Sequence, residues 1–391
     1  MKSEWQTARA ADFMDFNPRL SIKKGTVATK ISMDKLRPFT KAVPSVEQAE
    51  FSGGTKFANG DTIMARITPC LENGKTAFVD CLRENEIAFG STEFIVLRAK
   101  PGVSDPQFVY YLATSPEFRN VAIKSMVGSS GRQRVQQPVL ENLELTVPKL
   151  PEQEKIGHFL AELDDKIALN ERVNDNLYDL VNTLYTKLFK DTDCEMTTVE
   201  DYVDCIYSGG TPATSNMAYW NGNLNWLSSG ETRNRFVIST EKTITQLGAD
   251  NSSTKSAQKY DIVIASAGQG FTRGQTSMLL LNTYINQSVI VLHAKKTVLP
   301  YLFWNLTNRY DDLRAISDSS SIRGSLTTKM LSKLKIPKVE DSLILKFSEY
   351  AWSIIPQIEN NLIENKRLTD LRDSLLPKLM SGEIDVSDIQ L

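Results

Sequence analysis

Leucines recur at steps of three and four residues in two distant segments of the chain. The first set is Leu177, Leu180, Leu184 and Leu188, and the second is Leu368, Leu371, Leu375 and Leu379. This spacing places the side chains on one face of a helix. From Glu152 to about Lys190 there is no proline and one glycine, Gly157, so we expect one long helix there. The second copy, from Asp341 to Met380, contains Pro356, which we expect to break or kink its helix.

The two leucine segments belong to an internal repeat with a separation of about 191 residues. The matches that run without a gap are Ile167, Asn170, Asn174, Leu177, Asp179, Leu180, Leu184, Lys187 and Leu188 with Ile358, Asn361, Asn365, Leu368, Asp370, Leu371, Leu375, Lys378 and Leu379. Two similar modules related by an approximate twofold axis are therefore expected. We expect the two leucine stripes to pair as an antiparallel coiled coil. The alternative is that each helix packs on its own globular module.

Each long helix is preceded by a segment that reads as β-rich with short helices. Thr62 to Ile67 and Glu93 to Arg98 read as strands in the first segment, and Asp261 to Ala265 and Ser288 to His293 in the second. Short helices are expected at Pro106 to Ala113 and at Pro300 to Thr307. The predicted fold class is α+β, with two mixed α/β modules and two long helices in a pseudo-twofold repeat. The predicted boundaries are 1–149, 150–190, 191–339 and 340–391.

Positive charge is segregated along a chain whose net charge is only −2. The stretches Arg119 to Leu140, Ile262 to Tyr310 and Ser319 to Val339 contain basic residues and no acidic ones. A phosphate backbone requires only a local basic face, and arginine and glutamine side chains can read base edges. The alternative is that these residues are solvated surface groups. The candidate DNA-contacting residues are Arg66, Asn73, Lys75, Arg132, Gln133, Arg134, Gln136, Gln269, Arg273, Gln275, Arg323 and Lys329.

Residues with catalytic potential are sparse. The chain has two histidines, His158 and His293, and lacks a Gly-x-Ser-x-Gly sequence and a phosphate-binding loop. Asn17-Pro18-Arg19-Leu20 lacks the second proline and the aromatic residue of an amino-methyltransferase box. We expect no catalytic residues and no metal site. The absence of a long apolar run predicts a cytoplasmic protein with no membrane segment.

Four sequence segments, taken in order, resemble the DNA-specificity subunit of type I restriction-modification systems over the whole chain. They are KFANGDTIMARITPCLENGK from Lys56 to Lys75, LPEQEKI from Leu150, SGGTP with YWNG from Ser208 to Gly222, and LMSGEI from Leu379. The resemblance implies two target-recognition domains that each read one half of a split DNA sequence. It further implies that the two long helices set the gap between the half-sites.

The same resemblance implies partners that carry out the chemistry. Double-stranded DNA and two methyltransferase subunits are the expected partners, and restriction-translocation subunits join some such complexes. No cofactor is expected in this chain, because S-adenosylmethionine would be bound by the methyltransferase subunit. The alternative function is a DNA methyltransferase, or a fused restriction-methylation enzyme, with an unrecognised active site. Cofactor binding by the chain alone would distinguish that enzyme from a non-catalytic DNA-binding subunit.

Overall fold

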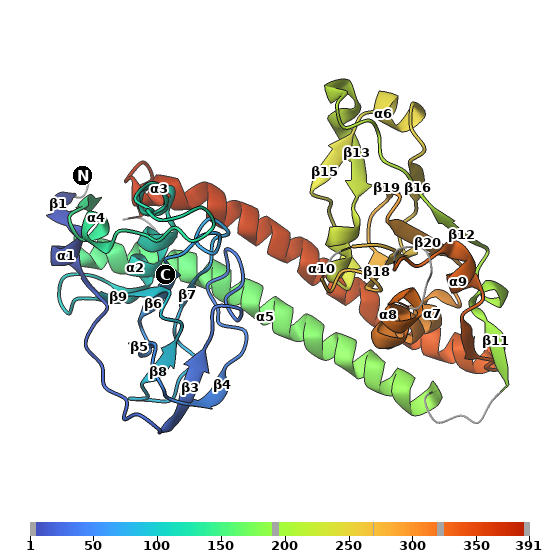
Figure 1. Cartoon of the computed structure of the whole chain (residues 1–391), viewed down its shortest axis with the longest axis horizontal. Coiled ribbons are helices and arrows are strands. Elements are labelled where there is room, and N and C mark those ends of the chain that lie inside the picture. Colours follow the sequence, from blue (N-terminus) through green and yellow to red (C-terminus); the bar gives the residue numbers. More distant parts are fainter. Residues whose placement is uncertain (1–4, 190–194, 269, 319–323, 387–391) are drawn as a thin grey trace. The chain divides into compact units, whose positions relative to one another are not determined.

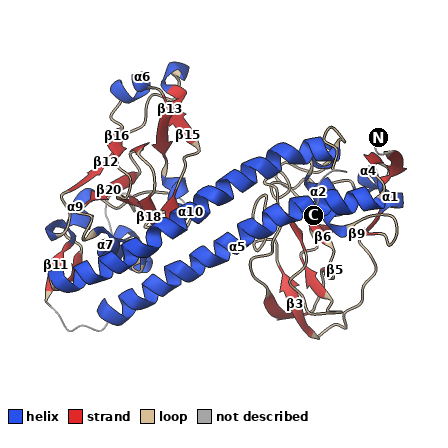
Figure 2. Ribbon diagram, turned by 180° about the vertical axis from the view of Figure 1, so that it is seen from behind, coloured by secondary structure: helices blue, strands red, loops and turns tan. Residues whose placement is uncertain are grey.

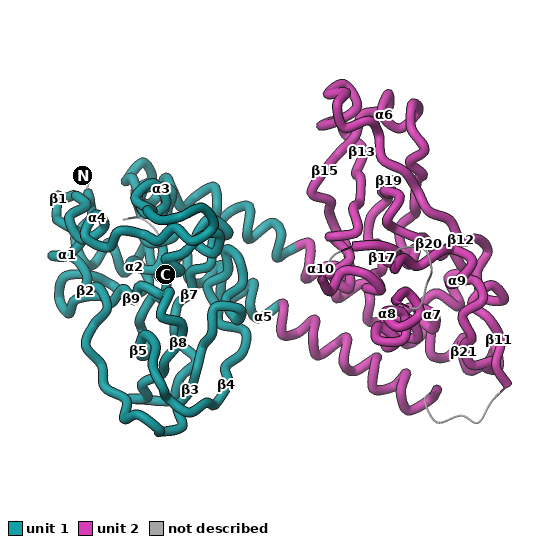
Figure 3. The backbone as a smooth tube through the Cα atoms, viewed as in Figure 1, with its two compact units in different colours: residues 1–170, 364–391 teal, residues 171–363 magenta. Residues whose placement is uncertain are grey.

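The computed structural model describes residues 5–189, 195–268, 270–318 and 324–386 (Figure 1). The chain divides into two compact units, which are coloured separately in Figure 3. Unit 1 comprises residues 1–170 and 364–391, and unit 2 comprises residues 171–363. Each unit therefore contains a globular module together with part of each long helix.

Both long helices run without interruption, as Figure 2 shows: α5 spans Leu150–Phe189 and α10 spans Asp341–Met380. The expectation that Pro356 breaks the second helix is wrong. A proline removes one backbone hydrogen bond from a helix. Its neighbours Ile355 and Ile358 are 0% and 1% exposed in the core of unit 2, and we attribute the continuity of α10 to this packing.

The strands of unit 1 form two four-stranded sheets and one two-stranded sheet. They are β1 (Gln6–Arg9), β2 (Met14–Phe16), β3 (Val27–Ile31), β4 (Glu47–Glu50), β5 (Thr55–Phe57), β6 (Thr62–Ala65), β7 (Thr76–Phe78), β8 (Ala88–Gly90), β9 (Phe94–Ala99) and β10 (Glu144–Val147). The sheet orders are β2-β9-β6-β7, β4-β3-β8-β5 and β1-β10. The short helices are α1 (Ala10–Phe13), α2 (Pro106–Thr114), α3 (Pro116–Lys124) and α4 (Gln137–Glu141).

Unit 2 repeats this topology with one added strand. Its strands are β11 (Met196–Thr198), β12 (Cys205–Ser208), β13 (Trp220–Leu227), β14 (Phe236–Val237), β15 (Lys242–Ile244), β16 (Lys255–Ala257), β17 (Ile262–Ala265), β18 (Thr276–Leu279), β19 (Thr283–Ile285), β20 (Val289–His293) and β21 (Lys335–Pro337). The sheet orders are β12-β20-β17-β18-β14, β15-β13-β19-β16 and β11-β21. Except for β14, every strand therefore has a counterpart at the same place in unit 1.

Unit 2 has counterparts of the four short helices of unit 1, namely η1 (Val199–Asp201), α7 (Leu299–Thr307), α8 (Tyr310–Asp318) and α9 (Thr328–Ser332), and adds η2 (Met217–Tyr219), η3 (Ser229–Arg233) and α6 (Gln246–Asp250). The pair α7 and α8 follows β20 as α2 and α3 follow β9. The predicted strands and short helices agree with the structure in type and, within a few residues, in position.

Helix α5 packs tightly against the start of α2 in unit 1. Pro106 occupies the first turn of α2, and the Asp105 carboxylate accepts a hydrogen bond from Phe108 N at 2.8 Å, which caps the helix. A Cβ atom on Gly157 would lie 2.6 Å from Asp105 Oδ1 and 2.9 Å from Phe108 N. Glycine is therefore required at position 157, because a side chain there would collide with the start of α2.

Within each unit the two long helices run antiparallel and share the core. In unit 1, Asp164 contacts Arg372, and Asn170 contacts Asn365. In unit 2, Asn174 contacts Asn361, and the rings of Phe189 and Phe347 lie 5.4 Å apart. As the residue number rises along α5 it falls along α10, as predicted from the repeat.

Candidate nucleic-acid interface

A polar loop between α3 and α4 carries Arg132 at an exposed position in unit 1. Gly128 and Gly131 adopt φ values of +140° and +77°, which favour glycine, and Arg132 N donates to Ser129 O at 3.0 Å. Among the described residues, the Arg132 side chain has no hydrogen-bond or ion-pair partner. Its guanidinium is therefore free to contact a phosphate.

Arg134, two residues further on, is already engaged. Its Nη2 lies 2.6 Å from Glu93 Oε1 and its Nε lies 2.9 Å from Glu93 Oε2, in a bidentate pair. The hydrogen bonds from Arg134 lower the pKa of Glu93. Arg134 also pairs through its backbone with Val127, so it closes the base of the loop. These contacts indicate that Arg134 holds the loop in place and does not bind phosphate.

Three other residues of unit 1 that were predicted to contact DNA donate hydrogen bonds to backbone carbonyls of the protein. Arg66 Nη2 donates to Val135 O at 3.2 Å, and Gln136 Nε2 donates to Arg134 O at 3.2 Å. Lys75 Nζ donates to Met33 O at 2.9 Å. Gln133 is half-buried, whereas Asn73 is exposed. Charge and polarity alone did not distinguish the braced side chains from the free ones.

The predicted contacts of unit 2 divide in the same way. Arg273 Nη1 donates to Gly324 O at 2.5 Å, and its Nη2 pairs with Asp318. Lys329 is exposed on α9, and Gln275 is half-buried at the end of the β17–β18 turn. Gln269 and Arg323 lie outside the described residues.

The aspartates that precede β6 in unit 1 and β17 in unit 2 have different partners. Asp61 accepts hydrogen bonds from Arg98 Nε at 2.6 Å and Nη2 at 2.7 Å. Asp261, which precedes β17 as Asp61 precedes β6, lies with its Oδ1 2.5 Å from His293 Nδ1. Burial raises the pKa of Asp261, and the histidine opposes this effect. The same architecture therefore carries different side chains in the two units.

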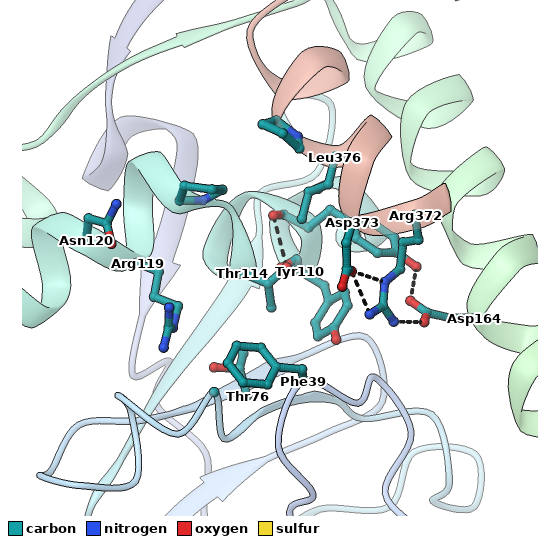
Figure 4. Close-up of a pocket in the computed structure, with 14 residues that line it drawn as sticks. Phe39, Thr76, Tyr110, Thr114, Arg119, Asn120, Asp164, Arg372, Asp373 and Leu376 are labelled. Carbon is teal, nitrogen blue, oxygen red and sulfur yellow. Dashed lines mark hydrogen bonds and ion pairs between the residues drawn. The ribbon is translucent and has the colours of Figure 1, made fainter. Parts of the chain in front are cut away.

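A cavity of about 230 Å³ in unit 1 lies where α2, α5 and α10 meet (Figure 4). Its charged wall consists of Arg372 between Asp164 and Asp373. Arg372 Nη1 lies 2.5 Å from Asp164 Oδ1, and Arg372 Nη2 lies 2.8 Å from Asp373 Oδ1. Tyr111 Oη donates to Asp164 Oδ2 at 2.6 Å. These charges satisfy one another, which makes the cluster a link between the helices and the module.

Burial alone would lower the pKa of Arg372, but the neighbouring carboxylates raise it above its ordinary value. The guanidinium is therefore charged at neutral pH. No group of three or more histidine, cysteine, aspartate or glutamate side chains in the described segments is arranged to hold a metal ion. No helix in those segments is long and apolar enough to cross a membrane.

The leucines of the two stripes differ in burial. Leu180 and Leu371 are 49% and 44% exposed, whereas Leu177, Leu184, Leu188 and Leu375 are partly buried against the core of their own unit and Leu379 is 1% exposed. Leu368 is half-buried. Each of these cores contains residues of both long helices as well as of the module, so the buried leucines pack where the paired helices meet the module.

Asparagines supply further polar contacts between the helices, besides the Asp164–Arg372 pair. In unit 1, Asn170 Nδ2 donates to Asn365 Oδ1 at 2.9 Å, and Asn365 Nδ2 donates to Ile167 O at 3.2 Å. In unit 2, Asn361 Nδ2 donates to Asn174 Oδ1 at 2.8 Å, and Asn174 Nδ2 donates to Ile358 O at 3.4 Å. The four asparagines occupy matched repeat positions. Sequence reasoning found the repeat but missed this role, because buried polar pairs were not sought.

Comparison with known families decides the class of protein. Residues 2–178 and 192–368 each match the model of the type I restriction modification DNA specificity domain. The two matches cover most of the chain. The chain belongs to this family. Membership confirms the predicted DNA-specificity role, which in type I systems is non-catalytic, and it does not favour a methyltransferase or fused enzyme.

Specificity subunits are also found among individual relatives. The chain is 24% identical to the type I restriction enzyme HindI specificity subunit of Haemophilus influenzae, over 83% of this chain and 86% of that protein. It is 39% identical to the EcoAI specificity subunit of Escherichia coli, over 27% of this chain and 18% of that protein. The S subunit from M. genitalium has a similar fold, with a TM-score of 0.58, 17% identity and coverage of 96% of both chains.

Proposed function

We propose that each unit of this specificity subunit reads one half of a bipartite, asymmetric DNA target. The observation that carries the proposal is one topology repeated with different polar side chains. Lys75 and Gln275 occupy the same place before β7 and β18, and Arg98 and His293 hold equivalent aspartates. Sequence-specific contacts depend on the side chains that reach the base edges. Units that differ in these side chains are expected to read different half-sites.

The two long helices would set the gap between the half-sites and bind two methyltransferase subunits. Asp179 and Leu180 recur as Asp370 and Leu371, and all four residues are exposed. Burial within this chain therefore does not explain why they recur. Two copies of one partner, bound at equivalent places, would explain it. S-adenosylmethionine would be bound by that partner, and a restriction-translocation subunit would complete a restricting complex.

A domain exchange tests the modular reading of DNA. Residues 1–149 would be replaced by the corresponding residues of another specificity subunit, and the methylated motif of the reconstituted complex would be mapped. We expect only one half of the motif to change. If both halves changed, the assignment of one half-site to each unit would be wrong.

Charge substitution on the helices tests the two docking sites. Leu180→Asp and Leu371→Asp should each reduce the bound methyltransferase from two copies to one, as counted by native mass spectrometry. Leu169→Asp is the matched control, because Leu169 is 46% exposed on α5 but has an asparagine, Asn360, at its repeat position. An equal loss caused by Leu169→Asp would contradict docking at the recurring positions.

A further inference from the structure

A recess of about 260 Å³ in unit 2 combines aromatic, basic and unpaired polar groups. It lies between η3, the β17–β18 turn and the junction of α7 with α8. The residues that line it are Thr232, Arg233, Arg235, Phe271, Gln275, Thr276, Thr307 and Tyr310. None of its aromatic residues was recognised as a candidate from the sequence.

Two oxygens in this recess lack a partner among the described residues. They are Gln275 Oε1 and Thr276 Oγ1, and Thr276 is only 6% exposed. Both oxygens are enclosed by the protein, so the side-chain amide nitrogen is the polar group that Gln275 can present in the recess. At the equivalent place in unit 1, Lys75 Nζ is bound to Met33 O at 2.9 Å. The unpaired amide oxygen of Gln275 thus replaces an internally bonded lysine.

Phe271 is held out at the edge of the recess. It is 80% exposed, which is unusual for a phenylalanine in a monomeric protein. Tyr310 Oη donates to Phe271 O at 2.8 Å, and Arg314 Nη1 donates to Gly270 O. These bonds hold the backbone carbonyls of Gly270 and Phe271, and the Phe271 ring is presented to solvent.

The positive charge of the recess is held by weak, exposed ion pairs. Arg233 pairs with Glu241 at 3.0 Å, and both side chains are more than 60% exposed. Arg235 lies 3.4 Å from Asp175 and is 50% exposed, and its guanidinium also lies over the Tyr178 ring, 4.2 Å from the ring centroid. Exposed pairs of this kind contribute little to stability, and each guanidinium can exchange its carboxylate for a phosphate at low cost.

We propose that this recess is a DNA-reading site of unit 2, an inference that rests on the proposed function. Gln275 donates from its side-chain amide nitrogen to an acceptor on a base edge, such as N7 of adenine. Phe271 makes the apolar contact with the neighbouring base, and Arg233 and Arg235 bind the flanking phosphates. The charge and the hydrogen-bonding pattern favour DNA over a protein partner.

The test uses the complex of the full chain with its methyltransferase partner and maps the methylated motif for each variant. Gln275→Glu retains the shape of the side chain but only accepts hydrogen bonds. It should lower methylation of the natural target about tenfold and shift one position of one half-site toward cytosine, because a carboxylate accepts from the cytosine amino group. Phe271→Ala should weaken binding about fivefold with the gap and the other half-site unchanged. Met217→Ala is the control, since Met217 is 72% exposed on η2 and should have no effect.

The possible outcomes separate this inference from the function on which it rests. A wild-type complex without a split motif would contradict the proposed function itself. If both recess variants leave the split motif unchanged, the assignment of the recess is wrong but the proposed function stands. The same conclusion follows if the variants lose methyltransferase binding while the specificity is unchanged. If Gln275→Glu prevents folding, Phe271→Ala decides, because an exposed ring contributes little to the core.

Discussion

Removing the Asp164 carboxylate should strongly destabilise unit 1. Asp164 and Arg372 have side-chain exposures of 6% and 10%, and Tyr111 Oη donates to the same carboxylate at 2.6 Å. Breaking a buried ion pair by removing one partner costs about 3 to 5 kcal/mol. The lower limit applies here because Arg372 retains Asp373, and the unpaired tyrosine hydroxyl adds about 1 kcal/mol. Asp164→Ala should therefore cost about 4 kcal/mol.

The assay is urea unfolding of the full-length chain, followed by hydrogen exchange in α2 and in the last turns of α10. These probes report on unit 1, so unfolding of unit 2 does not obscure the result. Asp370→Ala is the matched control on the same helix. It removes an exposed pair with Lys366, whose side-chain exposure is 51%, and should cost less than about 1 kcal/mol.

Tyr111→Phe provides an intermediate point in the series. It keeps the ion pair and removes the one hydroxyl hydrogen bond, so it should cost about 1 kcal/mol. If Asp164→Ala destabilised unit 1 by no more than Asp370→Ala, the cluster would not link the helices to the module.

Three further outcomes follow from the geometry. Arg132→Ala should reduce the slope of log binding constant against log salt by about 0.9, whereas Arg134→Ala should leave this slope unchanged; equal slopes for the two variants would contradict the assignment of Arg132 as the free guanidinium. Because the pKa of Glu93 is lowered in the folded protein, the pair with Arg134 stabilises the folded loop at pH values above 4.5, the ordinary pKa of a glutamate. This contribution is lost as the pH falls through the lowered pKa. Glu93→Gln should therefore show a smaller loss of thermal stability between pH 5 and pH 3 than wild type, and an identical loss would rule out the pair. Asn365→Ala removes a buried amide bonded to Asn170 and should cost about 1 to 3 kcal/mol in chemical denaturation, so a neutral result would show that the pair contributes nothing.

The repeat and the local patterns predicted most of the fold. Pro106 marked the start of α2, the proline-free run from Glu152 marked α5, and short apolar segments marked β6, β9, β17 and β20. The error at Pro356 arose because a local rule was applied to a helix that buries Ile355 and Ile358 on either side of the proline. Tertiary packing determined the outcome there, and it cannot be read from a proline in isolation.

The candidate site was harder to predict for a physical reason. Whether an arginine is free depends on acids far away in sequence, as for Arg134, which is held by Glu93. Spacing of three and four residues identifies one helix face but not what covers it, so the exposed Leu180 was not distinguished from its buried neighbours. The recess at Phe271 combines segments from η3 to α8, and only the folded chain brings these segments together.

The most direct test of the central claim is a genome-wide map of adenine methylation in cells with and without this gene. The account predicts that deletion removes methylation from one split motif, made of two different short half-sites around a fixed gap. Restoring the gene should restore that motif. Loss of a continuous or palindromic motif would contradict reading by two different units. A motif that persists in the deletion strain would contradict the role of this chain in specifying it.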